Sequence, residues 1–249
     1  MGVEPVPGRP AAVATTGGER LLVVADYHAG IERGLRRDGV ELGSDAEPRR
    51  KQLLGIVEST APDRIVFLGD LGHAIGAPAG EEREELLALF DAIEVPVTLV
   101  PGNHDGDFAE LLDEVSSPVT VTPGHGTRIG SVGFAHGHTW PSPDVLSADV
   151  VCIGHEHPVV RLEDEVGGTR VERVWLRGRV DPTPFEEYHD GALGIDADLV
   201  VCPAFNDRSG GTWVNVEGQE FLAPFLPEGL ADGEAYLLDG TRLGPYRGL

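Results

Sequence analysis

Residues 21–28 read LLVVADYH, in which an apolar run of five residues leads directly into Asp26 and His28. A short apolar run without polar alternation is typical of a strand that is buried on both faces. Four more runs end in the same way: residues 64–68 precede Gly69-Asp70, residues 95–100 precede Gly102-Asn103-His104-Asp105, residues 133–135 precede His136-Gly137-His138, and residues 150–153 precede Gly154-His155-Glu156-His157. The sequence therefore predicts five buried strands, each followed by a loop that carries Asp, Asn or His.

Two segments between these runs have the spacing of amphipathic helices. Residues 47–60 and 81–93 carry apolar side chains at helical intervals, and the second segment begins with an acidic turn that suits the helix dipole. Strands that alternate with helices predict a layered α/β fold, and short strands with glycine-rich turns dominate after residue 124. We expect residues 19–249 to form a single domain, preceded by a flexible or strand-forming arm of residues 1–18.

The charge of the chain is extreme. It has 42 acidic residues against 19 basic ones, a formal net charge of −23 and one lysine, Lys51. The acidic residues are spread along the chain, which is typical of a halophilic protein in a salty cytoplasm, where repulsion between charges is screened over short distances. The sequence has no apolar run long enough for a membrane helix and no signal-peptide pattern, so we expect a cytoplasmic protein in which Cys152 and Cys202 are buried, free thiols.

The residues that follow the predicted strands share one chemistry. Ligands of open α/β sheets bind at the carboxyl ends of the strands, so these oxygen and imidazole groups are expected to meet. Each motif alone is a weak signal, but the five together predict a metal centre. Two divalent ions about 3.5–4 Å apart clamp the attacking and leaving oxygens in phosphoryl displacement. The ligand set favours Mn²⁺, with Fe²⁺, Zn²⁺ and Ni²⁺ as alternatives, and the lack of cysteine in the motifs disfavours a structural zinc site.

The order of these motifs resembles that of the calcineurin-like metallophosphoesterase superfamily, from about residue 21 to about residue 211. The resemblance implies a four-layer α/β/β/α sandwich and two metal ions. It assigns the first metal to Asp26, His28, Asp70 and His157, and the second to Asp70, Asn103, His136 and His155, with Asp70 as the bridge. It also implies that His104 protonates the leaving group or steadies the transition state, and that Asp105 orients His104.

A closer resemblance is to the ICC-like group, which includes bacterial metallophosphoesterases encoded beside DNA ligase and a DEXH-box helicase. It is carried by residues 69–73 (GDLGH), 134–138 (FAHGH), 154–158 (GHEHP) and 202–206 (CPAFN), followed by Gly210-Gly211. This resemblance implies a Mn²⁺-dependent phosphodiesterase, with a DNA nuclease as one form and a helicase or ligase as partner. The chain has Gly72 where close relatives often carry a basic residue, so a phosphate contact at that position is not expected.

Two further histidines have two interpretations each. His73 follows Asp70 by three residues, and repair nucleases of the same superfamily carry a histidine at the matching position. We expect it to face the substrate, and the alternative is a surface loop histidine. His138 either contacts the substrate or forms a hydrogen bond with a group that supports a ligand.

Three functions fit these residues to different degrees. The first is a phosphodiesterase, including a nuclease that acts on DNA, and the second is a phosphomonoesterase or cyclic-nucleotide phosphodiesterase with the same metals. The third, a non-catalytic binding scaffold, is disfavoured because neither His104 nor any ligand is missing. The chain has no basic run, which disfavours tight binding of duplex DNA by this chain alone, although metal ions attract phosphate and a helicase partner would deliver the strand.

Overall fold

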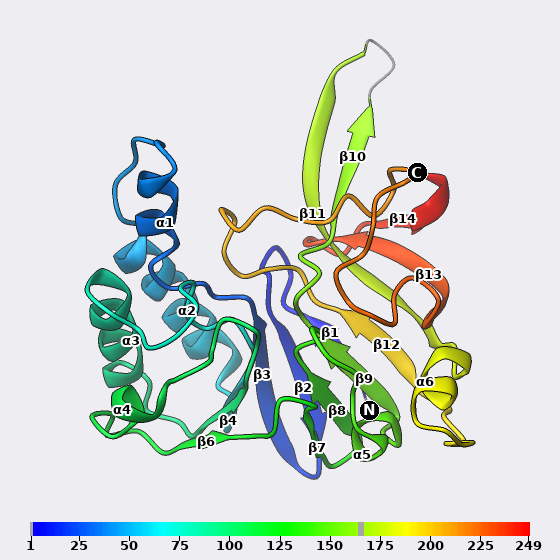
Figure 1. Cartoon of the computed structure of the whole chain (residues 1–249), viewed down its shortest axis with the longest axis horizontal. Coiled ribbons are helices and arrows are strands. Elements are labelled where there is room, and N and C mark those ends of the chain that lie inside the picture. The colour runs from blue at the N-terminus through cyan, green and yellow to red at the C-terminus, as the bar shows by residue number, and fades with distance from the viewer. Residues whose placement is uncertain (1, 164–166) are drawn as a thin grey trace.

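Two β-sheets pack face to face, and helices lie on their outer faces, in the computed structural model, which describes residues 2–163 and 167–249 (Figure 1). The order of layers is therefore helix, sheet, sheet, helix. This confirms the predicted four-layer α/β sandwich. In the described part of the chain, none of the helices combines the length and the apolar character needed to cross a membrane.

The first sheet has six strands in chain order and is mostly parallel. Its strands are β1 (Val3–Pro5), β2 (Ala12–Thr16), β3 (Glu19–Ala25), β4 (Arg64–Leu68), β5 (Val97–Val100) and β6 (Val119–Val121). Strands β3 to β6 run parallel, and such pairs need long crossovers. The helices α1 (Ile31–Arg37), α2 (Ala46–Thr60), α3 (Glu81–Asp91) and α4 (Ala109–Leu112) lie in those crossovers. Within this sheet, β1 pairs antiparallel with β2, and β2 pairs antiparallel with β3. The division of the chain into an arm of residues 1–18 and a single domain of residues 19–249 stays a prediction.

The second sheet has eight strands, in the order β14-β13-β11-β12-β9-β8-β7, with β10 paired to β11. They are β7 (Thr127–Ile129), β8 (Val132–Ala135), β9 (Val150–Ile153), β10 (Val159–Glu163), β11 (Thr169–Val180), β12 (Asp198–Val201), β13 (Leu230–Leu237) and β14 (Arg242–Pro245). The short helices are α5 (Pro143–Leu146), α6 (Thr183–Tyr188) and the 3₁₀ turn η1 (Tyr246–Gly248). The β10–β11 hairpin projects from the body of the molecule (Figure 1).

The core between the sheets is built from the apolar runs noted in the sequence. Leu21, Val23 and Val66 of the first sheet are buried in one cluster with Phe134 and Cys152 of the second. Both cysteines are free and buried, as expected from their apolar surroundings. A strand that is covered by a sheet on one face and by helices on the other has no solvent side, which is why its sequence shows no polar alternation.

A buried ion cluster ties the helical layer to the first loop. The Arg49 guanidinium of α2 contacts the Glu32 carboxylate of α1 at 2.9 Å and the Glu85 carboxylate of α3 at 2.8 Å, and all three side chains are buried. The Glu85 carboxylate also accepts a hydrogen bond from the Gly30 N–H at 2.9 Å. Because residue 30 follows the Asp26–His28 loop, the cluster anchors the end of that loop.

Replacing Arg49 with alanine would leave two carboxylates buried without their cation. Removing one partner of a buried ion pair costs about 3–5 kcal/mol, so we expect Arg49→Ala to lower the free energy of unfolding by that amount in a urea titration. The matched control is Lys51→Ala, because Lys51 pairs with Glu47 on the same helix but is largely exposed. The control should leave the free energy of unfolding nearly unchanged. Equal losses in the two variants would contradict the role given to Arg49.

Candidate metal centre

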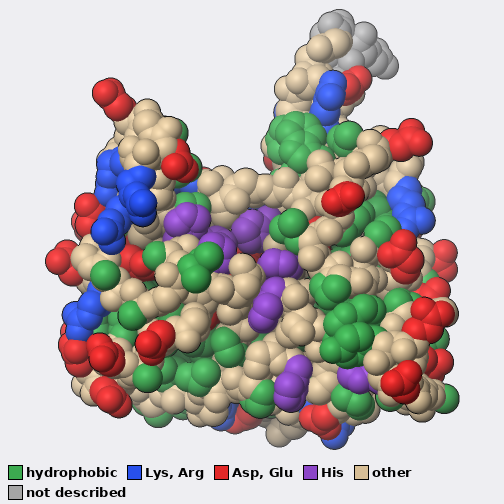
Figure 2. Space-filling view, viewed as in Figure 1, with side chains coloured by type: hydrophobic (Ala, Val, Ile, Leu, Met, Phe, Trp, Pro, Cys, Tyr) green, Lys and Arg blue, Asp and Glu red, His purple; other side chains and the backbone are tan. Residues whose placement is uncertain are grey.

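The five predicted loops meet at one edge of the paired sheets. They follow β3, β4 and β5 of the first sheet and β8 and β9 of the second. Figure 2 shows histidine side chains gathered in a hollow between two projections, which Figure 1 identifies as the α1 region and the β10–β11 hairpin. The surface is open here, so a substrate can approach the histidines from this face.

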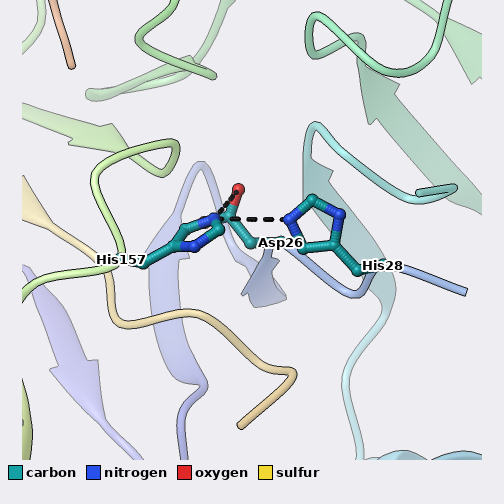
Figure 3. A group of neighbouring side chains, drawn as sticks. All are labelled: Asp26, His28 and His157. Atoms are coloured by element: carbon teal, nitrogen blue, oxygen red, sulfur yellow. Dashed lines mark hydrogen bonds and ion pairs between the residues drawn. The ribbon is translucent and has the colours of Figure 1, made fainter. Parts of the chain in front are cut away.

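Asp26, His28 and His157 form the first group of ligand atoms, all within 4.8 Å of one another and all buried (Figure 3). The His157 Nε2 atom lies 3.3 Å from Asp26 Oδ1 and 3.4 Å from His28 Nε2. Two imidazole nitrogens and a carboxylate oxygen thus converge on one point. A cation at that point satisfies all three lone pairs, so the residues present fit a divalent metal ion.

Asp70, His136 and His155 form the second group, also within 4.8 Å. The buried His136 ring donates from Nδ1 to the Leu68 carbonyl at 2.8 Å, which directs its Nε2 atom toward the other ligand atoms of this group. This Nε2 atom lies 3.4 Å from Asp70 Oδ1 and 3.3 Å from Asn103 Oδ1. Asn103 therefore lies beside the second group, and its role as a metal ligand stays a prediction.

The Asp70 carboxylate lies between the two groups. Its Oδ1 atom faces His136 of the second group at 3.4 Å, whereas its Oδ2 atom faces His28 of the first group at 3.8 Å. One oxygen toward each group is the arrangement that the predicted bridging role requires.

Strained backbone marks the ligand loops. Among the described residues, eight residues other than glycine have a positive φ, and five of these are predicted ligands: Asp26 (55°), His28 (48°), Asp70 (47°), His155 (67°) and His157 (44°). Each such residue costs on the order of 1–3 kcal/mol unless its surroundings hold it. The loops therefore turn their side chains toward a common point at the expense of local backbone energy.

Gly102 shows how tightly the loops pack around Asp70. A Cβ atom at residue 102 would lie 2.1 Å from Asp70 Oδ1 and 2.5 Å from the Asp70 amide nitrogen. No side chain fits there, so the glycine of the Gly-Asn-His-Asp motif is explained by the approach of the neighbouring ligand loop.

Burial and neighbouring charges set the ionisation of the ligands. Burial lowers the pKa of His28 to about 3, and burial together with His136 lowers the pKa of His155 to about 4. Both rings are therefore neutral at pH 7, which is the form that binds metal. Burial raises the pKa of Asp26 and Asp70, but the neighbouring histidines outweigh it and lower the pKa of both carboxyls. Burial lowers the pKa of His136 and His157, but the two carboxylates outweigh it and raise the pKa of His136 to about 9 and that of His157 above its usual value. The metal-free centre thus pairs two buried carboxylates with two protonated rings, whose protons a bound metal ion would displace.

The three predicted catalytic residues, His73, His104 and Asp105, lie beside the ligands, but the hydrogen bonds of His104 and Asp105 differ from those predicted. The His104 Nδ1 atom donates to the His73 backbone carbonyl, and its Nε2 atom lies 3.9 Å from Asp70 Oδ2. The His73 ring stacks on the His104 ring, with centroids 5.6 Å apart. Asp105 was expected to orient His104. Its carboxylate instead accepts hydrogen bonds from the backbone N–H groups of Leu71, Gly72 and Gly102.

Asp105 therefore joins two ligand loops, and the His73 carbonyl holds the His104 ring. The sequence could not distinguish these arrangements, because an aspartate next to a histidine is compatible with both. His138 lies next to His136, with ring centroids 5.3 Å apart, so it stands beside the second group.

Three buried polar residues that support the loops received no role from the sequence. Glu82 Oε1 accepts hydrogen bonds from the His73 and Ala74 N–H groups at 2.6 and 2.9 Å, and the Glu156 carboxylate accepts them from the Leu222 and Ala223 N–H groups. Asn206 belongs to the CPAFN motif, and its side chain contacts the Asp26–His28 loop. The sequence signal for Glu156 was its place between two ligand histidines, but Glu82 looked like an ordinary residue of an acidic helix start.

Comparison with known proteins identifies the family. Residues 19–144, just over half of the chain, match the family model described as calcineurin-like phosphoesterase. The chain belongs to the calcineurin-like phosphoesterase family. This confirms the superfamily assignment made from the motifs, whereas the ICC-like subgroup stays a prediction. Family membership and the two ligand groups together imply a hydrolase of phosphoesters that uses divalent metal.

A solved structure has the same fold. The crystal structure of the Pseudomonas putida nuclease MPE is 20% identical and superposes with a TM-score of 0.60, covering 97% of this chain and 100% of that chain. Yfce, a phosphoesterase from E. coli, is 15% identical with a TM-score of 0.39, covering 82% of this chain and 96% of that one. Comparison with curated proteins gave no match.

The packing around Gly102 gives a test of the ligand geometry in this family member. We expect Gly102→Ala to displace Asp70 and to reduce bound metal per chain in elemental analysis, because the new methyl group overlaps the carboxylate. Gly43→Ala is the control, since a Cβ atom there meets nothing within 4 Å. If the Gly102→Ala protein binds as much metal as the wild type, Asp70 is not a ligand in this position.

Proposed function

We propose that this chain is a phosphodiesterase that works with two divalent metal ions, of which Mn²⁺ suits the ligands best. The observation that carries the proposal is the position of Asp70, with one carboxyl oxygen toward each group of ligands. The first metal would be held by Asp26, His28, Asp70 and His157, and the second by Asp70, Asn103, His136 and His155. A set of imidazole, carboxylate and amide ligands without cysteine favours Mn²⁺ over structural zinc, with Fe²⁺, Zn²⁺ and Ni²⁺ as alternatives.

When bound, the two ions neutralise the phosphate and stabilise the charge that develops in phosphoryl displacement. The chain itself supplies the proton for the leaving oxygen. His104 keeps its Nδ1–H on the His73 carbonyl, so its Nε2 atom is the one directed toward Asp70 and the ligand groups. A protonated His104 can therefore give up its Nε2 proton and remain as the neutral Nδ1–H form, without breaking the hydrogen bond that orients it. His73, stacked on His104, would line the substrate's path.

Among phosphodiesters, nucleic acid is the substrate that we propose. The hollow is open, and Lys and Arg side chains gather on the α1 projection beside the histidines, although the chain as a whole is strongly acidic (Figure 2). The last turn of α1 contributes Arg36 and Arg37. The similar Pseudomonas putida protein is a nuclease, which supports the same choice. A helicase or ligase partner would deliver the strand, because a surface with this net charge binds phosphate backbones weakly by itself.

A substrate panel tests the proposed activity. With Mn²⁺ in concentrated salt, we expect hydrolysis of a nitrophenyl phosphodiester and of single-stranded DNA, and less hydrolysis of a phosphomonoester or a cyclic nucleotide. Chelation should abolish all activity, and Mn²⁺ should restore it. The proposal fails if diester hydrolysis continues after chelation with no metal found by elemental analysis. A monoester preferred over every diester would assign the chain to the phosphomonoesterases instead.

The role of His104 can be separated from metal binding. We expect His104→Ala to keep both metals and to lose kcat by about 10²–10⁴-fold, since this is the usual contribution of general-acid help. The loss should be smaller for a nitrophenolate leaving group, which needs little protonation. The measurements are metal content and kcat for one good and one poor leaving group, with His125→Ala as a control on an exposed histidine. Loss of a metal would make His104 a ligand, and equal losses for both substrates would exclude proton donation.

A further inference from the structure

Residues 205 and 206 run alongside the first ligand loop. They come shortly after β12 of the second sheet, whereas the loop follows β3 of the first sheet. The Phe205 N–H donates to the Ala25 carbonyl at 2.8 Å, and the Asn206 N–H donates to the Asp26 carbonyl at 3.2 Å. The segment lies outside residues 19–144, the part that matches the family model. Residues 205 and 206, which lie outside the matched part, therefore support the Asp26–His28 loop, which lies inside it.

The Asn206 side chain extends this contact by two residues. Its Nδ2 group donates to the Tyr27 carbonyl at 3.1 Å and to the His28 carbonyl at 3.2 Å, while its Oδ1 atom accepts from the Arg208 N–H at 3.0 Å. The residue is only 3% exposed. Both hydrogens of the amide are therefore used on the ligand loop, and four consecutive carbonyl groups of residues 25–28 are bound by residues 205 and 206.

The loop needs such support because its backbone is strained. Asp26 and His28 have φ values of 55° and 48°, in the left-handed region that residues with a side chain seldom adopt. The N–H groups of Asp26 and His28 are held by the carbonyls of Gly69 and Asp70. The loop is thus fixed through its N–H groups by the first sheet and through its carbonyl groups by residues 205 and 206.

Aromatic packing places the two segments but does not fix the carbonyls. The Phe205 ring stacks on the Tyr27 ring, with centroids 5.6 Å apart and planes 19° from parallel. Stacking of this kind tolerates sliding and rotation, whereas two hydrogen bonds from one amide define the orientation of two successive peptide groups. The orientation of these peptides sets where the side chains of Asp26 and His28 point.

We propose that Asn206 is a positioning residue for the first metal, because its amide holds the backbone turn that presents Asp26 and His28. The inference rests on the proposed two-metal site. It gives Asn206 no contact with metal or substrate. It predicts that loss of the amide donor weakens the metal held by Asp26, His28 and His157 more than the one held by Asn103, His136 and His155.

The test compares Asn206→Asp with the wild type. Aspartate has nearly the same size and keeps an acceptor for the Arg208 N–H, but it places an oxygen where Nδ2 faces two carbonyl oxygens. Changes to groups that orient metal ligands commonly cost about 10–100-fold in affinity. We expect one of the two Mn²⁺ ions to bind about 10–100-fold more weakly in calorimetric titration, and the spin coupling between paired Mn²⁺ ions to be lost from the electron paramagnetic resonance spectrum at limiting metal.

Asn215→Asp is the matched control. Asn215 also joins two segments through backbone groups, since it accepts from the Arg161 N–H at 3.0 Å and donates to the Arg161 carbonyl at 2.8 Å. Within the part of the chain that the structure describes, its side-chain hydrogen bonds do not reach a ligand loop. Both metals should bind to this variant as in the wild type. Thermal unfolding of the metal-free proteins shows whether each variant is folded, and Asn206→Ala, which removes the donor without adding charge, replaces Asn206→Asp if the latter is unfolded.

The outcomes separate this inference from the proposed function. A wild-type chain that binds fewer than two metals overturns the two-metal site and the inference with it. A wild-type chain that binds two metals, with Asn206 variants that bind both at unchanged affinity, overturns the positioning role alone. Equal weakening of both metals in a folded variant also overturns it, because a general loosening of the structure has no preference between the two groups.

Discussion

Burial of the ligand groups is the constraint on which this structure depends. Asp26 and Asp70 are ionised and crowded with four imidazoles in one buried centre, where His136 and His157 have a raised pKa and offset part of the carboxylate charge. Without a cation, each of these groups loses its hydration and gains only partial compensation. The chain would relax this crowding by turning the side chains apart. The strained ligand residues, the packing at Gly102 and the hydrogen bonds to the loops all prevent that movement.

Some of the acidic residues help to hold the ligand loops and the helical layer in place. Glu32, Glu82, Glu85 and Glu156 are all nearly inaccessible to solvent, and their carboxylates bind Arg49 or backbone N–H groups. A carboxylate accepts several hydrogen bonds at once and makes stronger ones than a neutral acceptor. The net charge of −23 therefore combines a solvated acidic surface with an internal set of acceptors, although the sequence alone gives both the same appearance.

The fold and the ligand groups were predictable because the ligands lie in short loops that follow apolar runs. Residues 64–68 and 150–153 are strands with the predicted bounds, and the glycine-containing loops after them bring their side chains to one edge. The roles of Asp105 and Asn206 were not predictable in the same way. Their partners are backbone groups of segments far away in the sequence, and any segment offers such groups. Only the packing of the sheets determines which backbone lies within reach.

Each group of ligands takes residues from both sheets. The first combines Asp26 and His28, which follow β3, with His157, which follows β9; the second combines Asp70, which follows β4, with His136 and His155 from the second sheet. Neither sheet holds a complete set, so the relative position of the sheets determines the distances between ligand atoms. A metal ion that binds only when both sheets are in place stabilises their packing through its own binding energy. The apolar core between the sheets and the metal centre at their edge therefore support the same arrangement.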